Sequence, residues 1–295
     1  DVIHIFSEIK SPYVACVLVY LKGMLAPLVF ENYDVGNGMY REGYVEKYLL
    51  EKEKYCVENA DGICCRGYEI DYLYENLNFK IHGKIIKFFD YCQKGEIPVL
   101  NMDENRPLSL CYVGGITTEK ECPGASNACF LELGKLCEVN QCHLHLYPCE
   151  WDEERYAEYI ELDEKREYFH FHRPIPFREL RQELSKYDYG IHPIKRECIE
   201  KDLDWRLTKN KYEYGAANKF FDYLDAGLPI IAGSLNRFLE LFEKEKVLLR
   251  WSMEEYDFEK MRYERDNLRK NVTAAREKLG IDNNINELIE FYDSL

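Results

Sequence analysis

The chain has no long hydrophobic run. Its longest apolar stretch, residues 13–21, ends at Lys22 and Gly23 and is too short to cross a bilayer. No secretory leader is visible before the strand-like residues 2–6. We therefore expect a cytoplasmic protein with at most a peripheral contact to membranes.

The chain also has no excess of basic residues. It carries 54 acidic and 39 basic side chains, which give a formal net charge of −15. An acidic surface repels the phosphates of nucleic acids and of anionic membranes, so we expect no nucleic-acid partner. A hydrophobic fraction of 46% with 14% aromatic residues excludes a disordered chain.

The spacings of common metal and dinucleotide sites are missing as well. No G-x-G-x-x-G motif is present, and the 12 cysteines form no C-x-x-C pair. The densest group comprises Cys122, Cys129, Cys137, Cys142 and Cys149, with His143 and His145 nearby. We expect reduced thiols that pack as small apolar groups, with zinc as the minor alternative. The two histidines share one face of a strand, where we expect them to pack.

What the chain does have is a regular alternation of strand-like and helical segments. Strands are expected at 1–6, 27–31, 62–65 and 85–89, then at 108–113, 143–147, 168–172, 189–194 and 229–232. Helices are expected at 12–22, 44–60, 217–226 and 236–244, and in a charged tail, 253–295, that breaks near 280–284. The turn-rich segment 95–107 separates two units, 1–103 and 104–295, each with a parallel sheet.

The first strand of the second unit ends in a pair of glycines. Gly114 and Gly115 allow backbone N–H groups to approach a diphosphate closely, with Thr117 just beyond them. An ordinary turn between a strand and a helix would use the same glycines, and this alternative stays open.

A more specific pattern occupies residues 216–233. Phe220, Phe221 and Leu224 form one apolar helix face, and the Gly-Leu-Pro that follows ends the helix. Asn218, Lys219 and Asp222 lie within about one helical turn of each other. Lys219 supplies a positive charge for phosphate, and Asp222 can accept two hydrogen bonds from a ribose diol. The alternative is a surface ion pair between Lys219 and Asp222.

The segment N-K-F-F-D-Y-L-D-A-G-L-P-I-I resembles the donor-site signature of GT-B glycosyltransferases, K-x-x-E-Y-x-x-x-G-x-P-V-I. Other segments resemble the same family in the same order: D-V-I-H at 1–4, E-N-A-D-G-I at 58–63, V-G-G at 113–115, F-H-R-P-I-P at 171–176, and F-R-E-L through Y-D-Y-G-I-H-P at 177–193. The resemblance covers nearly the whole chain.

The resemblance implies an α/β fold of two Rossmann-like domains that face a cleft, the first of them incomplete at its N-terminus. It implies a nucleoside diphosphate sugar of UDP or GDP type as substrate, with no cofactor. Because no Asp-x-Asp metal motif stands out in the second unit, we also expect no metal. The acceptor would be a glycan or lipid-linked sugar in surface polysaccharide synthesis. The donor-binding residues would be Gly114, Gly115, Thr117, Arg173, Ile175, His192, Asn218, Lys219, Phe220 and Asp222, with Lys219 also stabilising the departing diphosphate.

A polar loop follows the second strand of the first unit. Glu31, Asn32, Asp34 and Asn37 lie at the end of a strand where open α/β sheets bind ligands. We expect Asp34 to accept the proton of the acceptor hydroxyl and the other three residues to contact the acceptor. A turn-forming loop is the alternative. His4 lies within a strand, where we expect it in the core.

Two departures from the family pattern keep other functions open. Tyr214 stands where retaining members often have the first Glu of Glu-x7-Glu, and Gly115 stands at a position that is usually basic. Lys120, Arg173 or Lys219 could supply the missing charge. A sugar-nucleotide epimerase of the same fold and a non-catalytic nucleotide-sugar binding subunit are the alternatives to a glycosyltransferase.

Overall fold

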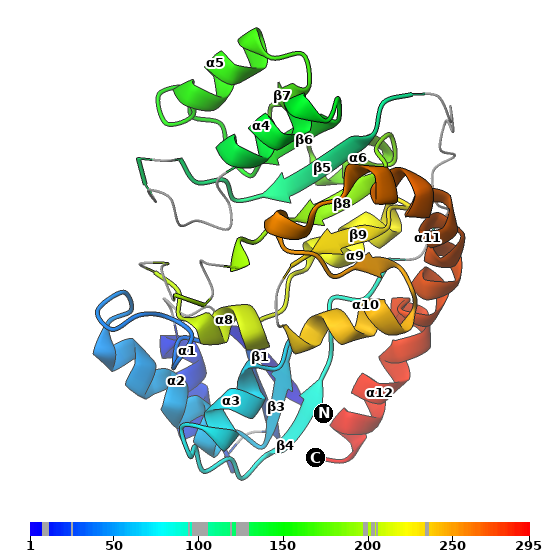
Figure 1. The fold of residues 1–295 in the computed structure, drawn as a ribbon. Helices are drawn as coiled ribbons and strands as arrows, with labels where there is room; N and C mark the ends of the chain where they lie inside the picture. Colours follow the sequence, from blue (N-terminus) through cyan, green and yellow to red (C-terminus); the bar gives the residue numbers. More distant parts are fainter. Residues whose placement is uncertain are drawn as a thin grey trace.

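The computed structural model describes residues 1–7, 12–24, 26–93, 95, 106–118, 120–121, 130–196, 200–201, 204, 206–233 and 236–295. Two parallel sheets lie one above the other (Figure 1). The first has the order β1-β2-β3-β4 and the second has the order β10-β9-β8-β5-β6-β7. Strands that alternate with helices thus build two Rossmann-like units, as the sequence predicts.

Three helices cover one face of the first sheet. Its strands are β1 (Ile3–Ser7), β2 (Leu28–Asn32), β3 (Gly62–Cys65) and β4 (Lys84–Lys87), and its helices are α1 (Tyr13–Tyr20), α2 (Lys47–Asn59) and α3 (Glu69–Glu75). Leu28 and Phe30 face a core formed with these three helices, whereas Val29 between them faces the opposite side. The two-residue period of a strand explains this division.

The second sheet is covered on both faces. Its strands are β5 (Ser109–Gly114), β6 (His143–Pro148), β7 (Phe169–Phe171), β8 (Tyr189–His192), β9 (Ile230–Ala232) and β10 (Leu248–Leu249). Its helices are α4 (Leu131–Val139), α5 (Ala157–Lys165), α6 (Phe177–Leu184), α9 (Lys219–Asp225), α10 (Glu240–Lys244) and α11 (Phe258–Lys278), with short 3₁₀ turns at Arg237–Leu239 and Met253–Glu255. The helix α8 (Lys209–Tyr214) instead packs against α3, and its Tyr214 joins the core of the first sheet. One core lies under α4, α5 and the start of α11, and the other lies under α6, α9, α10 and the end of α11.

The last helix returns to the first sheet. In α12 (Ile281–Asp293), Phe291 packs with Val29 and Cys64 on the face of the first sheet that α1, α2 and α3 leave open. Figure 1 shows α12 running down beside this sheet, so that both chain ends lie close together. This differs from the expectation that all helices of the tail belong to the second unit. The reason is that Val29 and Cys64 need an apolar cover.

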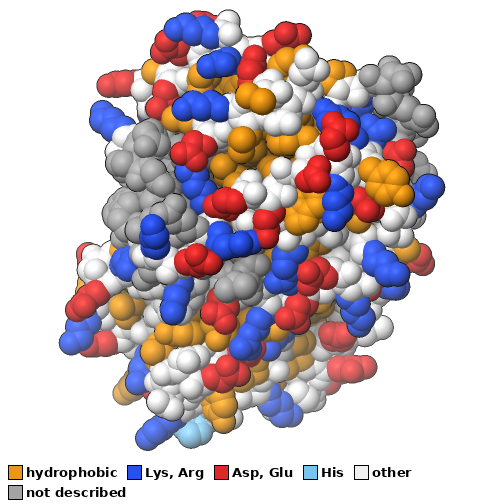
Figure 2. All heavy atoms as spheres, viewed as in Figure 1, with side chains coloured by type: hydrophobic (Ala, Val, Ile, Leu, Met, Phe, Trp, Pro, Cys, Tyr) orange, Lys and Arg blue, Asp and Glu red, His pale blue; other side chains and the backbone are white. Residues whose placement is uncertain are grey.

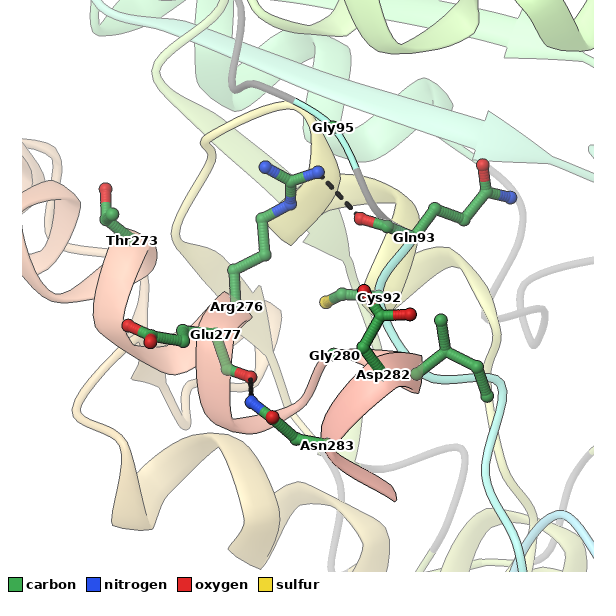
Figure 3. A pocket seen from close by; sticks show the side chains of 10 residues that line it. Cys92, Gln93, Gly95, Thr273, Arg276, Glu277, Gly280, Asp282 and Asn283 are labelled. Carbon is green, nitrogen blue, oxygen red and sulfur yellow. Dashed lines mark hydrogen bonds between the residues drawn. The ribbon is translucent and has the colours of Figure 1, made fainter. Parts of the chain in front are cut away.

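The two chain segments that cross between the units meet at one point. The N–H of Cys92 donates to the carbonyl of Leu279 over 2.7 Å, and the N–H of Ile281 donates to the carbonyl of Cys92 over 3.0 Å. Arg276 of α11 donates to the carbonyl of Gln93 over 2.8 Å at the edge of a cavity of about 660 Å³ (Figure 3). The expected boundary between residues 103 and 104 lies outside the described residues.

The described cysteines follow the expectation from composition. The cysteines within the described ranges are free, and most of them are buried, which agrees with thiols that pack as apolar groups; Cys122 and Cys129 fall outside those ranges. Figure 2 shows acidic and basic side chains interspersed over one face of the molecule. Across the described part of the chain, no helix combines the length and the apolar character that a membrane crossing requires.

Candidate functional site

The carboxyl ends of β5 and β8 form the centre of the candidate site. These strands are neighbours, with Leu110 paired to Tyr189 and Cys111 to Gly190, so Gly114 and His192 end at the same edge of the sheet. Gly114 has a φ of +141°, which favours glycine, and the hydroxyl of Tyr112 donates to the carbonyl of Gly115 over 2.9 Å. The turn is therefore fixed, and Gly115 is exposed at its tip.

Lys219 extends over this turn from the first residue of α9. A Cβ atom placed on Gly114 would lie 3.1 Å from Lys219 Cε and 3.4 Å from its Nζ, and Nζ lies 5.0 Å from the centre of the Tyr112 ring. Burial lowers the pKa of Lys219 to about 8, against the opposing effect of Asp222. No ion pair within the described residues joins Lys219 to Asp222, so the ion-pair alternative loses its support.

His192 lies beside Lys219 and is held by the core. Its ring meets the ring of Phe220 edge to face at 5.6 Å, and burial, followed by the charge of Lys219, lowers its pKa to about 3. His192 is thus neutral at pH 7. Phe220 is only 2% exposed and packs with Phe238 and Phe242, because its helix face covers the sheet. The Phe220 ring therefore packs in the core and contacts His192, and the expected donor contact of Phe220 stays a prediction.

Asp222 lines the surface near the contact between the two units. It lines two hollows of about 340 and 390 Å³ that also share Gln93, Phe177 and Asp225. Burial, and next the charge of Asp225, raises the pKa of Asp222 to about 6. A half-buried carboxylate beside an exposed aromatic ring, Phe177, suits a ribose and its base.

Asn218 brings the two units into contact at the site. Its side-chain amide donates to the hydroxyl of Tyr33 over 3.0 Å, and Tyr33 follows β2 of the first unit. The Tyr33 ring carries the guanidinium of Arg66 at 3.9 Å from its centre, and Arg66 donates to Asp90. Sequence reasoning missed Tyr33 and Arg66, although Arg66 directly follows the predicted strand 62–65 and Tyr33 lies two residues after the predicted strand 27–31.

Asp34 also reaches the second half of the chain. Nζ of Lys211, in α8, lies 2.9 Å from Asp34 and 3.2 Å from Glu69, and its side chain is 15% exposed. Asp34 keeps 38% of its side chain exposed, so a ligand can approach the carboxylate while Lys211 fixes its direction. No sequence motif indicated Lys211, because its two partners lie more than 140 residues away along the chain.

A buried carboxylate holds the loop that carries Tyr33 and Asp34. Glu53 in α2 is 2% exposed and accepts bonds from the N–H groups of Gly36 and Asn37 over 2.7 and 2.8 Å. It also accepts bonds from the side-chain amides of Asn32 and Asn37. The side-chain amides of Asn32 and Asn37 therefore bind Glu53. These bonds are enough to explain why both residues stand in the loop, without any contact to an acceptor substrate.

Glu31 faces the other side of the first sheet. Its carboxylate lies 2.9 Å from Nε2 of His4, whose Nδ1 lies 2.6 Å from the hydroxyl of Tyr292 in α12. This differs from the expected acceptor contact, because alternation along β2 directs Glu31 and Val29 to the α12 side. His4 is half-buried between strand and helix, so the expectation that it packs in the interior holds in part.

The other predicted donor residues have contacts of their own. Thr117 is 5% exposed and its carbonyl accepts from Tyr159 of α5 over 2.8 Å. The side chain of Arg173 is 70% exposed, lies 3.4 Å from Glu153 and stacks on Trp151. Ile175 packs against the core under α6. Lys219 is therefore the cation that the structure brings to Gly114.

One Asp-x-Asp pattern in the second half has a structural use. The prediction of a metal-independent reaction did not consider Asp202 and Asp204, which form this pattern. Asp204 is 1% exposed and accepts bonds from the N–H of Arg206 and the hydroxyl of Tyr212, both over 2.8 Å, whereas Asp202 lies outside the described residues. Asp204 is thus occupied by bonds within its own segment.

The arrangement of the whole chain matches that of solved glycosyltransferases. The pneumococcal O-GlcNAc transferase GtfA, solved with UDP and GlcNAc, matches 94% of this chain over 54% of its own length, with a TM-score of 0.59 at 12% identity. HepE of Anabaena, solved with UDP, matches 99% of this chain over 79% of its own, with a TM-score of 0.64 at 11% identity. The UDP-forming trehalose-phosphate synthase of Burkholderia vietnamiensis matches 98% of this chain over 72% of its own length, with a TM-score of 0.58 at 8% identity.

This chain therefore has the GT-B fold, which confirms the predicted fold class. At identities this low, the likeness concerns the fold. The chain spans about half the length of GtfA, at 54%. No family model and no curated protein sequence matches the chain.

Proposed function

We propose that this GT-B chain is a glycosyltransferase whose second unit holds a nucleoside diphosphate sugar. The position of Lys219 carries the proposal, because its ammonium group lies over the Gly114 turn at the end of the central strand β5. Open α/β sheets bind ligands at this edge, and a glycine turn with a cation suits a diphosphate. HepE and GtfA, which share the fold, were solved with UDP.

In the proposed reaction, an acceptor hydroxyl attacks the anomeric carbon of the donor sugar. The bond between that carbon and the diphosphate oxygen breaks, and the electron pair leaves with the diphosphate. Lys219 stabilises the negative charge that grows there, which lowers the barrier because this interaction strengthens in the transition state. The α9 helix has only seven residues, so the charge of Lys219 matters more than the helix dipole.

Residues on both sides of the Tyr33–Asn218 contact bind the ribose and the base and accept the proton of the acceptor hydroxyl. Asp222 accepts hydrogen bonds from the ribose, and Phe177 offers its exposed ring to the base. Asp34, oriented by Lys211, takes the proton from the acceptor hydroxyl.

The identity of the acceptor follows from the sequence resemblance alone. A glycan or lipid-linked sugar in surface polysaccharide synthesis is the proposed class, with a cytoplasmic location. The reaction proceeds without a metal ion in this proposal, since Lys219 supplies the positive charge at the diphosphate.

The direct test is a thermal-shift screen of the full chain against UDP, GDP, CDP and their sugars. A nucleotide at 100 times its dissociation constant stabilises the folded state by about 2.7 kcal/mol, which raises the melting temperature. Donor turnover with sugar acceptors then tests transfer. Binding without turnover would favour a binding subunit, and release of nucleoside diphosphate without acceptor would favour an epimerase. If no nucleotide changes the melting temperature, the proposed function is wrong.

A further inference from the structure

Four histidines from two neighbouring strands form one column on the second sheet. They are His143 and His145 of β6, and His170 and His172 at β7 and its end. His145 pairs with His170 in the strand register, and the two rings stack with their centres 4.3 Å apart. His-x-His in each strand places both rings on the same face, so the four imidazoles come together.

The nitrogens of this column lie close enough to share an ion. Nδ1 of His143 lies 2.8 Å from Nε2 of His170, and Nδ1 of His145 lies 2.9 Å from Nε2 of His172. One nitrogen each from His143, His145 and His170 lie within 4.8 Å of one another. Zinc–nitrogen bonds of 2.0–2.1 Å in a tetrahedral site separate the ligand nitrogens by about 3.3 Å, so the rings need only small rotations.

The surroundings leave these rings partly accessible. All four side chains are half-buried on the edge strand and its neighbour, and His170 is 28% exposed. Asp163 lies 3.9 Å from Nδ1 of His170, where it favours a proton on that nitrogen and leaves Nε2 for an ion.

We propose that His143, His145 and His170 form a binding site for one divalent transition-metal ion, with Zn²⁺ as the ion they suit best. Three imidazoles with a water as fourth ligand form a common zinc arrangement. His172 is a positioning residue, since its Nε2 accepts the proton on Nδ1 of His145 and leaves the other nitrogen of His145 for the ion. The bound ion would tie the edge strand β7 to β6. This site is independent of the proposed glycosyl transfer.

The test is Zn²⁺ binding to the metal-free full chain by equilibrium dialysis and calorimetry. We expect saturable binding of one ion per chain. His145→Ala and His170→Ala should each weaken it more than His172→Ala, which should weaken it about 10–100-fold, the usual cost of losing a supporting group. His172→Asn, whose side-chain oxygen can also accept the His145 proton, should recover part of that loss. The exposed His82→Ala variant is the control and should bind like wild type.

The absorption spectrum of bound Co²⁺ identifies the ligands without any mutation. A second group, His4, Glu31 and Cys64, also brings three possible ligand atoms within 4.8 Å, but it contains sulfur. Binding at the histidine column should give visible d–d bands and no thiolate-to-cobalt band in the near ultraviolet. Diethyl pyrocarbonate labelling of wild type should show Zn²⁺ protection at the four histidines.

Three results would overturn the proposal. These are the absence of saturable Zn²⁺ binding, a thiolate-to-cobalt band, or wild-type affinity in a His145→Ala, His170→Ala double variant that melts as wild type does. If that variant does not fold, protection from labelling in wild type still decides the question, because protection outside the column contradicts the site.

Discussion

The surroundings of Lys219 determine how this residue can act. Its first neighbours are a glycine turn, the Tyr112 ring and the neutral imidazole of His192, so no carboxylate within the described chain neutralises it. The lowered pKa records the cost of keeping a charged group among such neighbours. A diphosphate would compensate that charge, which is why the unpaired lysine indicates a ligand.

The first prediction concerns the charge of Lys219. Lys219→Ala should lower turnover about 10²–10³-fold and change the apparent Michaelis constant for the donor less, because the charge matters most as the diphosphate leaves. With a pKa of about 8 in the free protein, Lys219 is charged below that pH, so kcat/KM for the donor in wild type should fall as the pH rises through about 8. Lys219→Arg should remove this alkaline decline, since arginine stays charged. Near wild-type turnover in Lys219→Ala would leave Lys219 without a catalytic role.

The second prediction concerns the binding of ribose by Asp222. Asp222→Ala should weaken nucleotide binding by about 1–3 kcal/mol, and Asp222→Glu should be milder. Because its pKa of about 6 is raised, Asp222 becomes protonated as the pH falls through 6, so affinity should decline there in wild type. Asp222→Asn should show no such decline. Calorimetry with UDP and GDP from pH 5 to 8 measures this, and equal affinities for wild type and Asp222→Ala would remove the ribose assignment.

Sequence reasoning found residues that act through local spacing and missed those that act across the chain. Lys219 and Gly114 were predicted because each lies within a recognisable strand–turn or helix pattern. Glu53 and Lys211 carry no such pattern, since the side chains and N–H groups that they bind lie at least 16 residues away along the chain. Phe220 was assigned to the donor although its spacing already placed it on the apolar face that the sheet buries.

At the scale of the elements, the loop after β2 depends on one helix. The carboxylate of Glu53 in α2 accepts bonds from Gly36, Asn37 and Asn32, and this fixes the segment that presents Tyr33 and Asp34. The loop was predicted as a ligand site or a turn, and the structure shows how the turn is held. The strand ends were predictable from hydrophobic runs, but the anchor of the loop was not.

The third prediction tests this anchor. Glu53→Ala should lower the free energy of unfolding by about 1–3 kcal/mol, because it leaves the buried N–H groups of Gly36 and Asn37 without an acceptor. Glu51→Ala, an exposed glutamate on the same helix, should change it by less than about 0.5 kcal/mol. Urea unfolding of both variants measures the difference. Equal small changes would show that Glu53 does not hold the loop.

At the scale of the whole molecule, the two units are joined by crossing elements as well as by side chains. The α12 helix leaves the second unit at Gly280 and packs on the first sheet through Phe291. Asn218–Tyr33 and Lys211–Asp34 connect the units near the site. The break at 280 was predicted from Gly280 and its polar neighbours, but the destination of α12 was not, because an amphipathic helix does not specify which sheet it covers.

The fourth prediction tests the packing of α12. Phe291→Ala should destabilise the protein by about 3–5 kcal/mol, as expected when a buried aromatic side chain leaves a cavity. Ile289→Ala on the same helix is the control, because Ile289 is 47% exposed. Chemical denaturation of the two variants compares them. If Phe291→Ala proves as mild as Ile289→Ala, then α12 does not stabilise the first sheet as described.

The central claim is that a nucleoside diphosphate binds at the second unit, over the Gly114 turn and the start of α9. Amide hydrogen exchange of the full chain, measured with and without saturating UDP or GDP, tests it most directly. We predict slower exchange in peptides that cover residues 112–117 and 216–224, with smaller effects near Tyr33. Protection confined to residues 1–93 would contradict the account.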